Sequence, residues 1–456
     1  MGRRLWDKGD ALHPRVLAYT VGQDHLLDLE LVEEDVWGSL AHSRMLEEVG
    51  LLTAADRRAI GAGLLEVLAE HRRGAFRIAP EEEDVHTAVE GRLAERAGEP
   101  GRRLHTGRSR NDQVLVDVRL FLRRRLLDLV EAGLGVARAL VDLARGHADV
   151  VVPGFTHLRQ AMPSSVGLWA LGQAEGLEES LEACLDAARA ADRCPLGAAA
   201  GFGVPLPLDR RRVAALLGFS RVQVNAQAVQ SSRGKAEAQA LFAATLLAHD
   251  LGKLAWDLIL ATGPEQGWFV LPPDCATGSS IMPQKRNPDV LELTRANAAV
   301  VQSHLDRVLL VAGKLPSSYH RDYQLTKEPL LRGLALARSM AEVMELTVSG
   351  LEVDRARAEA AVLPEALATH RAMALVEGGL PFRDAYRQVG AELAAGRLEG
   401  VGDLEAARAA YRTEGSPGNL RLEDAGARLD ALAGAARDAR APLAAALERL
   451  EREATA

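Results

Sequence analysis

A short polar segment at residues 277–289, TGSSIMPQKRNPD, contains side chains that can do chemistry. It offers two hydroxyls, an ammonium and an amide within nine residues: Ser279, Ser280, Lys285 and Asn287. Its glycine and paired serines do not easily continue a helix, so we expect a loop that can present several backbone N–H groups to an anion. An ordinary loop that caps the next helix is the alternative. Only six lysines occur in the chain, so a lysine at this position indicates that a compact ammonium is needed there.

Two other turn-rich segments contain polar side chains of catalytic type. Residues 154–158 (GFTHL) include a Thr-His pair, and residues 105–113 (HTGRSRNDQ) include a Ser-Arg-Asn-Asp run. A lone histidine is more often structural than catalytic, and serine or asparagine in the second run could simply cap a helix. A capped helix N-terminus also suits a carboxylate ligand, so both interpretations of 105–113 stay open.

The elements that must position these loops are helices. Aromatic residues make up only 4% of the chain, while Ala, Leu, Arg and Glu, which lose little entropy in a helix, dominate it. Apolar residues at steps of three and four predict long helices over 115–143 and 241–258. We therefore expect an all-α fold with a central bundle of long helices. Apolar residues on more than one helix face favour an oligomer, with a long monomeric bundle as the alternative.

Shorter helical segments on both sides of this bundle divide the chain into three expected domains. With 456 residues the chain can bury more than one core. We predict an N-terminal helical domain at 1–107, a central bundle at 108–360 with most of the catalytic loops, and a small C-terminal helical domain at 361–456. The last boundary rests on glycines and prolines that interrupt the helical pattern beyond it.

Charge and composition exclude several classes of function. The net charge of −8 leaves no surplus of cations for nucleic acid. Charged residues interrupt the longest apolar region, around 236–262, so it is not expected to cross a membrane. The first ten residues lack the apolar core of a signal peptide, and three cysteines without metal-ligand spacing fit a reducing compartment. We expect a cytoplasmic protein.

The segment 277–289 resembles the signature of the fumarase/aspartase superfamily, Gly-Ser-Ser-x-Met-Pro-x-Lys-x-Asn, and matches it without a gap. Members of this superfamily make fumarate by anti-elimination from a succinyl group. The resemblance implies an all-helical homotetramer with a 20-helix core, active sites that each draw on three subunits, and no metal or other cofactor.

Three further segments are similar to the argininosuccinate lyase branch of the superfamily: 105–113, 154–158 and LPSSYHRDYQLTKE at 315–328. Shorter matches near both ends, such as DVHTAVE at 84–90, extend the resemblance over nearly the whole chain. It implies reversible cleavage of a small molecule, argininosuccinate, to arginine and fumarate, the last step of arginine biosynthesis. The resemblance implies catalytic roles for His157, Ser279, Lys285 and Glu292, and substrate-binding roles for Thr20, Arg110, Asn111, Thr156, Asn287, Tyr319, Gln324 and Lys327.

This chemistry makes a physical demand on the implied residues. Removing a proton beside a carboxylate places a second negative charge on that carboxylate, so donors must point to where the charge develops. Lys285, Asn287 and loop N–H groups fit that role, and an electropositive loop would lower the pKa of Ser279 as a base. His157 would act at the departing guanidino nitrogen, oriented by Glu292. The acid and base assignments of the serine and the histidine could be reversed.

The sequence also departs from the family pattern. Residues 5–8 (Leu-Trp-Asp-Lys) replace a Trp-Gly-Gly-Arg-Phe opening, Thr20 stands where serine is common, and SSRG at 231–234 replaces a more acidic Ser-Asp-Arg-Asp. His370 replaces an aspartate. None of these changes removes a proposed catalytic group.

Two alternative functions remain at this point. One is another fumarate-releasing lyase, of the adenylosuccinate lyase, fumarase or aspartase type. The other is an inert structural protein, as some δ-crystallins are, which the retained Ser279, Lys285 and His157 disfavour.

Overall fold

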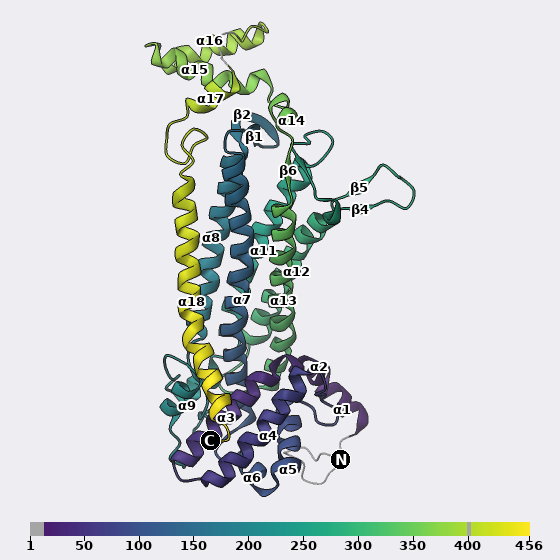
Figure 1. The fold of residues 1–456 in the computed structure, drawn as a ribbon, viewed down its shortest axis with the longest axis vertical. Helices are drawn as coiled ribbons and strands as arrows, with labels where there is room; N and C mark the ends of the chain where they lie inside the picture. Colours follow the sequence, from purple (N-terminus) through teal and green to yellow (C-terminus); the bar gives the residue numbers. More distant parts are fainter. Residues whose placement is uncertain (1–12, 399–402) are drawn as a thin grey trace.

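A computed structural model describes residues 13–398 and 403–456. Residues 5–8, which depart from the family pattern, and the first ten residues, which lack the apolar core of a signal peptide, lie outside the described residues. In the part of the chain that is described, six long helices run side by side and form the body of the molecule (Figure 1). These helices are α7 (Arg110–Gly146), α8 (Val166–Ala191), α11 (Lys235–Ala261), α12 (Asp289–Ala312), α13 (Lys327–Ser349) and α18 (Leu422–Glu453).

Two of these helices confirm the apolar patterns in the sequence. The predicted helices at 115–143 and 241–258 lie within α7 and α11, and their apolar residues form the main core with α8, α12 and α13. Helix α7 begins at a capping box, in which the Ser109 hydroxyl accepts from the N–H of Asn111 and the Ser109 N–H donates to Asp112. The capping interpretation of this run is therefore confirmed, and the all-α fold class is confirmed as well.

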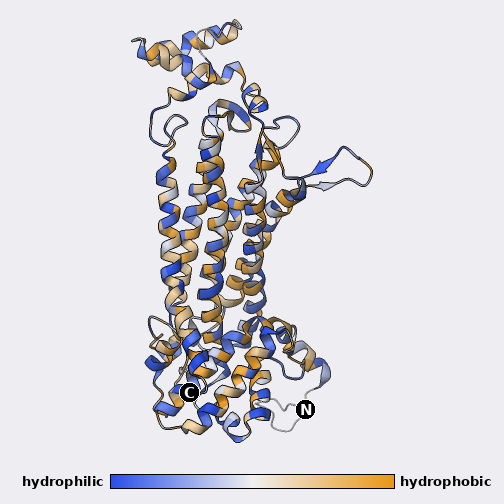
Figure 2. Ribbon diagram, viewed as in Figure 1, coloured by the Kyte–Doolittle hydropathy of each residue, from blue (hydrophilic) through white to orange (hydrophobic). Residues whose placement is uncertain are grey.

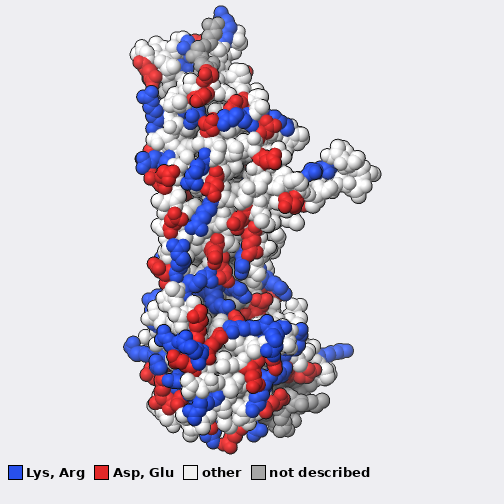
Figure 3. All heavy atoms as spheres, in the orientation of Figure 1, with Lys and Arg blue, Asp and Glu red and all other residues white. Residues whose placement is uncertain are grey.

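A second core lies at the end of the bundle where α7 begins. Shorter helices surround it, and the last turns of α18 pack into it through Leu443, Leu447 and Leu450. Figure 3 shows many charged side chains on the surface of this end. The helices here are α1 (Pro14–Val21), α2 (Asp24–Leu27), η1 (Asp28–Leu31), α3 (Val32–Glu48), α4 (Ala54–Arg72), α5 (Val85–Ala97), α6 (Glu99–Arg103), α9 (Arg210–Leu216) and α10 (Ala226–Ser231).

The opposite end of the bundle carries small helices and a hairpin (Figure 1). These helices are α14 (Arg355–Ala360), η4 (Pro364–Leu367), α15 (Ala368–Glu377), α16 (Phe382–Ala394) and α17 (Leu404–Ala409). The hairpin pairs β1 (Val151–Thr156) with β2 (Arg159–Ser165), where the sequence indicated only a turn-rich stretch. The three-domain division stays a prediction. The structure adds that α18 returns along the bundle and contacts both cores.

A second hairpin forms an arm that projects from the side of the molecule (Figure 1). Its strands β4 (Thr277–Gly278) and β5 (Arg286–Asn287) pair in antiparallel register and frame the predicted loop. Two further short strands pair near the base of the arm: β3 (Phe269–Val270) and β6 (Glu352–Val353). The 3₁₀ helix η2 (Pro273–Cys275) lies between β3 and β4 in the chain. Figure 3 shows the tip of the arm without charged side chains.

The described residues include no helix long and apolar enough to span a bilayer.

Candidate active site

Five of the predicted substrate-binding residues line one pocket of about 440 Å³ at the lower end of the bundle. The first turns of α7, α11 and α13 meet there with α2, α5 and the 3₁₀ helix η3 (Arg321–Thr326). Segments more than 200 residues apart in the sequence thus supply one cavity. The five predicted residues are Arg110, Asn111, Tyr319, Gln324 and Lys327.

Lys327 is buried in this pocket between two carboxylates. Its Nζ donates to Asp28, and to Asp24 at 3.2 Å. Burial by itself would lower the pKa of Lys327, but the two carboxylates raise it, so the side chain keeps its charge. Burial raises the pKa of Asp24 to about 6 even though the ammonium opposes that shift. Lys327, which is predicted to bind substrate, thus also joins α2 and η1 to the start of α13.

Arg110 lies at the first turn of α7 and is held by acidic and hydroxyl groups from α5. Its guanidinium pairs with Asp84 and donates to the Thr87 hydroxyl at 2.8 Å. Gln324 donates from Nε2 to the carbonyl oxygen of Thr20 at 2.9 Å. These contacts fix two polar side chains at the pocket wall.

Thr20 itself does not line the pocket. Its hydroxyl donates to the carbonyl oxygen of Val16 at 2.9 Å, within α1. In this chain it reaches the site only through its backbone oxygen, which accepts from Gln324 and from Arg321. The structure does not bring this predicted residue together with the other five.

Thr156 and His157 lie on the hairpin at the far end of the bundle, and both are exposed. Residues Thr156 and Arg159 pair across a two-residue turn, in which His157 and Leu158 have φ of 53° and 56°. Positive φ at both turn positions matches the twist of a tight hairpin. The histidine is therefore presented at a turn tip, away from the pocket of its own chain.

Ser279, Lys285 and Asn287 lie on the projecting arm. The Ser279 hydroxyl oxygen accepts from the backbone N–H of Met282 at 3.1 Å and of Ile281 at 3.4 Å. Asn287 donates from its amide to the carbonyl oxygen of Gly278 at 3.3 Å, which ties the two strands together. Donors directed at a hydroxyl oxygen favour its anion, so this geometry suits the predicted serine base. The sequence signature does not reveal these two N–H groups, because they depend on the turn geometry.

Glu292 is exposed on the first turn of α12, directly after the arm. Apart from Thr20 on α1, the predicted residues of one chain thus fall into three places: the pocket, the far hairpin, and the arm with Glu292 (Figure 1).

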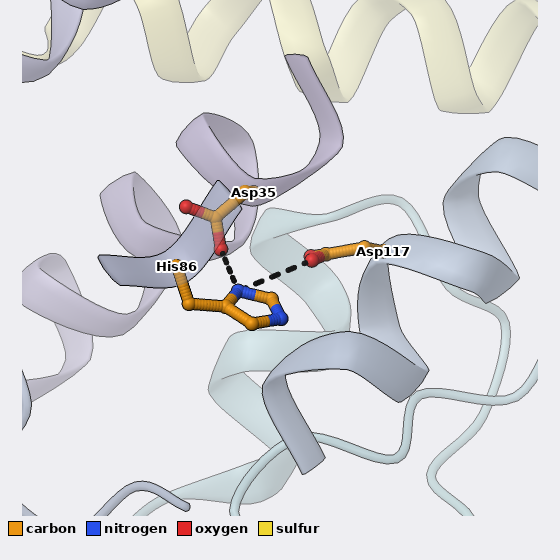
Figure 4. Close-up of side chains that lie close together, drawn as sticks. All are labelled: Asp35, His86 and Asp117. Atoms are coloured by element: carbon orange, nitrogen blue, oxygen red, sulfur yellow. Dashed lines mark hydrogen bonds and ion pairs between the residues drawn. The ribbon is translucent and has the colours of Figure 1, made fainter. Parts of the chain in front are cut away.

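His86 also lines the pocket, and its Nδ1 atom faces the buried carboxyl groups of Asp35 and Asp117 (Figure 4). Its Nδ1 lies 2.8 Å from Asp35 and 3.7 Å from Asp117. Burial alone would lower the pKa of His86, but Asp35 and further carboxylates raise it above the usual value. The sequence pointed to the segment DVHTAVE without assigning a role to its histidine.

Asp35, His86 and Asp117 form a group that could in principle hold a metal ion, with ligand atoms within 4.8 Å of one another. A metal would need the lone pair of Nδ1, where the raised pKa of His86 favours a proton. The site therefore fits an imidazolium held by the Asp35 carboxylate better than a metal ligand. The absence of a metal from the reaction stays a prediction.

Comparison with known proteins agrees with the fold. A family model described as "Lyase" matches residues 17–303. Among solved structures, an EDDS lyase in complex with formate has a TM-score of 0.76 at 25% identity, covering 98% of this chain and 94% of that one. A class II fumarase from Schistosoma mansoni has a TM-score of 0.72 at 18% identity, covering 93% and 94%. The class is thus a helical lyase with the fumarase fold.

Curated relatives narrow this class. The chain is 47% identical to the argininosuccinate lyase of Sorangium cellulosum, over 94% of this chain and 99% of that protein. It is 40% identical to that of Stenotrophomonas maltophilia, over 95% and 100%, and 39% identical to that of Thermotoga neapolitana, over 85% and 98%. The chain belongs to the argininosuccinate lyase family.

Proposed function

We propose that the protein splits argininosuccinate reversibly into arginine and fumarate, in the cytoplasm, as the last step of arginine biosynthesis. The observation that carries this proposal is the pocket. It gathers five residues expected to bind this substrate, in a chain whose relatives at 37–47% identity are named for the same reaction.

The charges of the pocket support an arginine-containing substrate. Argininosuccinate carries a guanidinium, an ammonium and three carboxylates, and a wall that presents acidic and basic side chains together suits both signs of charge. The pocket wall includes the carboxylates of Asp24, Asp28, Glu83, Asp84 and Glu237.

The arm supplies the groups for the elimination step. With Ser279 as base, its alkoxide, which two backbone N–H groups stabilise, takes the proton from the carbon beside a succinyl carboxylate and becomes the neutral hydroxyl. Lys285 and Asn287 then face the carboxylate that becomes doubly charged, and His157 gives a proton to the leaving guanidino nitrogen. In the alternative assignment, His157 removes the proton from the carbon and Ser279 gives a proton to the leaving nitrogen.

We further propose a homotetramer in which each site combines the pocket, the hairpin and the arm from different chains. The long helices support this arrangement, because large apolar side chains remain exposed on α11, α12 and α13 of the single chain. Figure 2 shows hydrophobic residues distributed along the long helices of the bundle. Burying them against partner helices would stabilise the assembly by about 25 cal/mol per Å². Examples are Phe242, Trp256, Leu293, Leu310 and Leu346.

The test is the release of fumarate, followed by its ultraviolet absorbance. Argininosuccinate should react, while adenylosuccinate, malate and aspartate should not. Ser279→Ala should lower kcat by on the order of 10²–10³ or more, with helix content unchanged. Ser303→Ala is a matched control, since its hydroxyl donates only to a carbonyl oxygen within α12. Turnover of another succinyl substrate in place of argininosuccinate, or an inert wild-type protein, would refute the proposal.

A further inference from the structure

Arg233 is a cation that lacks an anionic partner in the described structure. Its Nε and Nη1 atoms are buried and make no hydrogen bond to any described residue. The guanidinium lies instead against the rings of Tyr319 and Tyr323, 5.1 Å from each ring centroid. Aromatic faces stabilise a cation but leave its N–H donors unused. A buried unpaired charge is costly, so an anion bound here would gain the full benefit of these donors.

The other cations of the pocket already have carboxylate partners. Arg108 pairs with Glu90, Arg110 with Asp84, Arg321 with Glu83, and Lys327 with Asp28. Each of these side chains is thus compensated within the chain. Among the described arginines and lysines that line the pocket, Arg233 is the one without an acidic side chain within 4.0 Å.

Glu237, in the first turn of α11, complements Arg233, which lies in the turn directly before this helix. It is buried, lines the same pocket, and makes no hydrogen bond or ion pair of 4.0 Å or less with the described residues. Its charge acts on Arg233 and also on Arg119 of α7. Because both side chains line the same pocket, its wall presents a cation and an anion together, each with free hydrogen-bonding capacity.

We propose that Arg233 and Glu237 bind the zwitterionic amino-acid end of the substrate, Arg233 its α-carboxylate and Glu237 its α-ammonium group. This inference rests on the proposed function. Argininosuccinate has three carboxylates, and the two on the succinyl half are those served by the reacting groups of the arm. The third stands beside an ammonium, which is the charge pair that this wall complements. A charged N–H donor on a carboxylate gives a short, strong hydrogen bond that fixes orientation as well as affinity.

The test compares the binding of arginine with that of two analogues, by titration calorimetry on the full-length protein. Agmatine lacks the α-carboxylate, and 5-guanidinopentanoate lacks the α-ammonium group. Wild-type protein should prefer arginine to both analogues by about tenfold to a hundredfold. Arg233→Met should abolish the preference over agmatine, and Glu237→Gln the preference over 5-guanidinopentanoate. Fumarate binding should change by less than about threefold in both variants.

Arg125→Met is the control, because Arg125 also lies over an aromatic ring, Phe121, but outside this pocket. It should keep both preferences. Circular dichroism establishes that each variant is folded, and Arg233→Gln replaces the methionine variant if that one is not. An Arg233 variant that still prefers arginine to agmatine by the wild-type factor overturns the inference. If wild-type protein meanwhile releases fumarate from argininosuccinate, the proposed function stands, so the two failures are distinguishable.

Discussion

Individual charged side chains in the pocket hold the fold and the site together. Lys327 satisfies Asp28 and Asp24, which come from the first described helices, while its own backbone starts α13. His86 stands in a similar position between the pocket and the buried Asp35. Each such residue stabilises a junction between elements, so its replacement affects folding as well as binding. Stability and activity must therefore be measured together for these positions.

Replacing Lys327 by methionine leaves the buried Asp28 and the partly buried Asp24 without their cation. Removing one partner of a buried ion pair typically costs about 3–5 kcal/mol, so we expect the free energy of unfolding to fall by this amount and Tm with it. Lys253→Met is the matched control, because its pair with Asp250 at 3.0 Å is on the surface. That change should cost less than about 1 kcal/mol. Equal effects of the two substitutions in denaturant unfolding would contradict the assigned role.

The buried carboxylate of Asp117 makes stability depend on pH. Burial, and then the neighbouring Asp35, raise the pKa of Asp117 well above its usual value, and its oxygens have no hydrogen-bond donor among the described residues. The fold thus favours the protonated acid. A raised pKa contributes stability that is complete below the unfolded-state pKa and is lost as pH rises through the folded-state value.

Asp117→Asn keeps the neutral form at every pH. We therefore expect the stability of this variant, relative to wild type, to increase steadily as pH rises from about 4 to 8. Urea unfolding at several pH values measures this slope. Asp430→Asn, on the exposed surface, should show a constant small difference. Parallel pH profiles of Asp117→Asn and wild type would show that the carboxyl does not titrate as expected.

At the scale of elements, tight turns and helix starts present the reacting groups. The turn at His157 and Leu158 requires two residues with positive φ, and the arm closes through the paired β4 and β5. Gly234, directly after Arg233, is the N-cap of helix α11 and has φ of 84°. A glycine occupies this position without strain, while most other residues would not. The backbone at this point therefore sets the direction in which Arg233 enters the pocket.

Gly234→Ala should disturb the start of α11. The added Cβ would be strained by the positive φ and would lie 2.5 Å from the Cβ of Ala312. We expect a loss of about 1–3 kcal/mol in unfolding free energy and weaker arginine binding. Gly172→Ala in α8 is the control, since a Cβ there meets no atom within 4 Å and helix propensity favours alanine. A Gly234→Ala protein as stable as wild type would show that this backbone can relax at no cost.

At the scale of the whole molecule, the three groups of proposed site residues lie far apart, and on this proposal a single chain is incomplete as a catalyst. The hairpin lies at one end of the bundle, the pocket at the other, and the arm projects between them (Figure 1). Rigid helices of 23 to 37 residues join these places, so they cannot meet within one chain by a small movement. Association of several chains is the simplest way to bring them together.

This arrangement predicts complementation between inactive variants. His157→Asn and Ser279→Ala each remove one group from every site, so each homotetramer should be inactive. Reassembly of an equal mixture should restore about a quarter of wild-type activity. Each site needs one chain with an intact His157 and another with an intact Ser279, and each of these is present with a probability of about one half. Each variant dissociated and reassembled alone serves as the control. No recovery in tetramers shown by native mass spectrometry to be mixed would mean that both residues act within one chain.

The sequence by itself determined the local elements and the chemical character of the loops. Apolar residues at steps of three and four define α7 and α11, because neighbours at these steps share a helix face. The Ser109 cap follows from the same local rules, and the residues of the arm were identified from their order along the chain.

Only the tertiary structure decided which distant residues meet. Periodicity records which face of a helix is buried but not which other helix covers it, so the convergence of Arg110, Gln324 and Lys327 could not be read from the pattern. For the same reason the unpaired state of Arg233 beside Glu237, and the distance of His157 from the pocket, appear only in three dimensions. Pairing of charges depends on the packing of elements far apart in the chain, and that packing is a property of the whole fold.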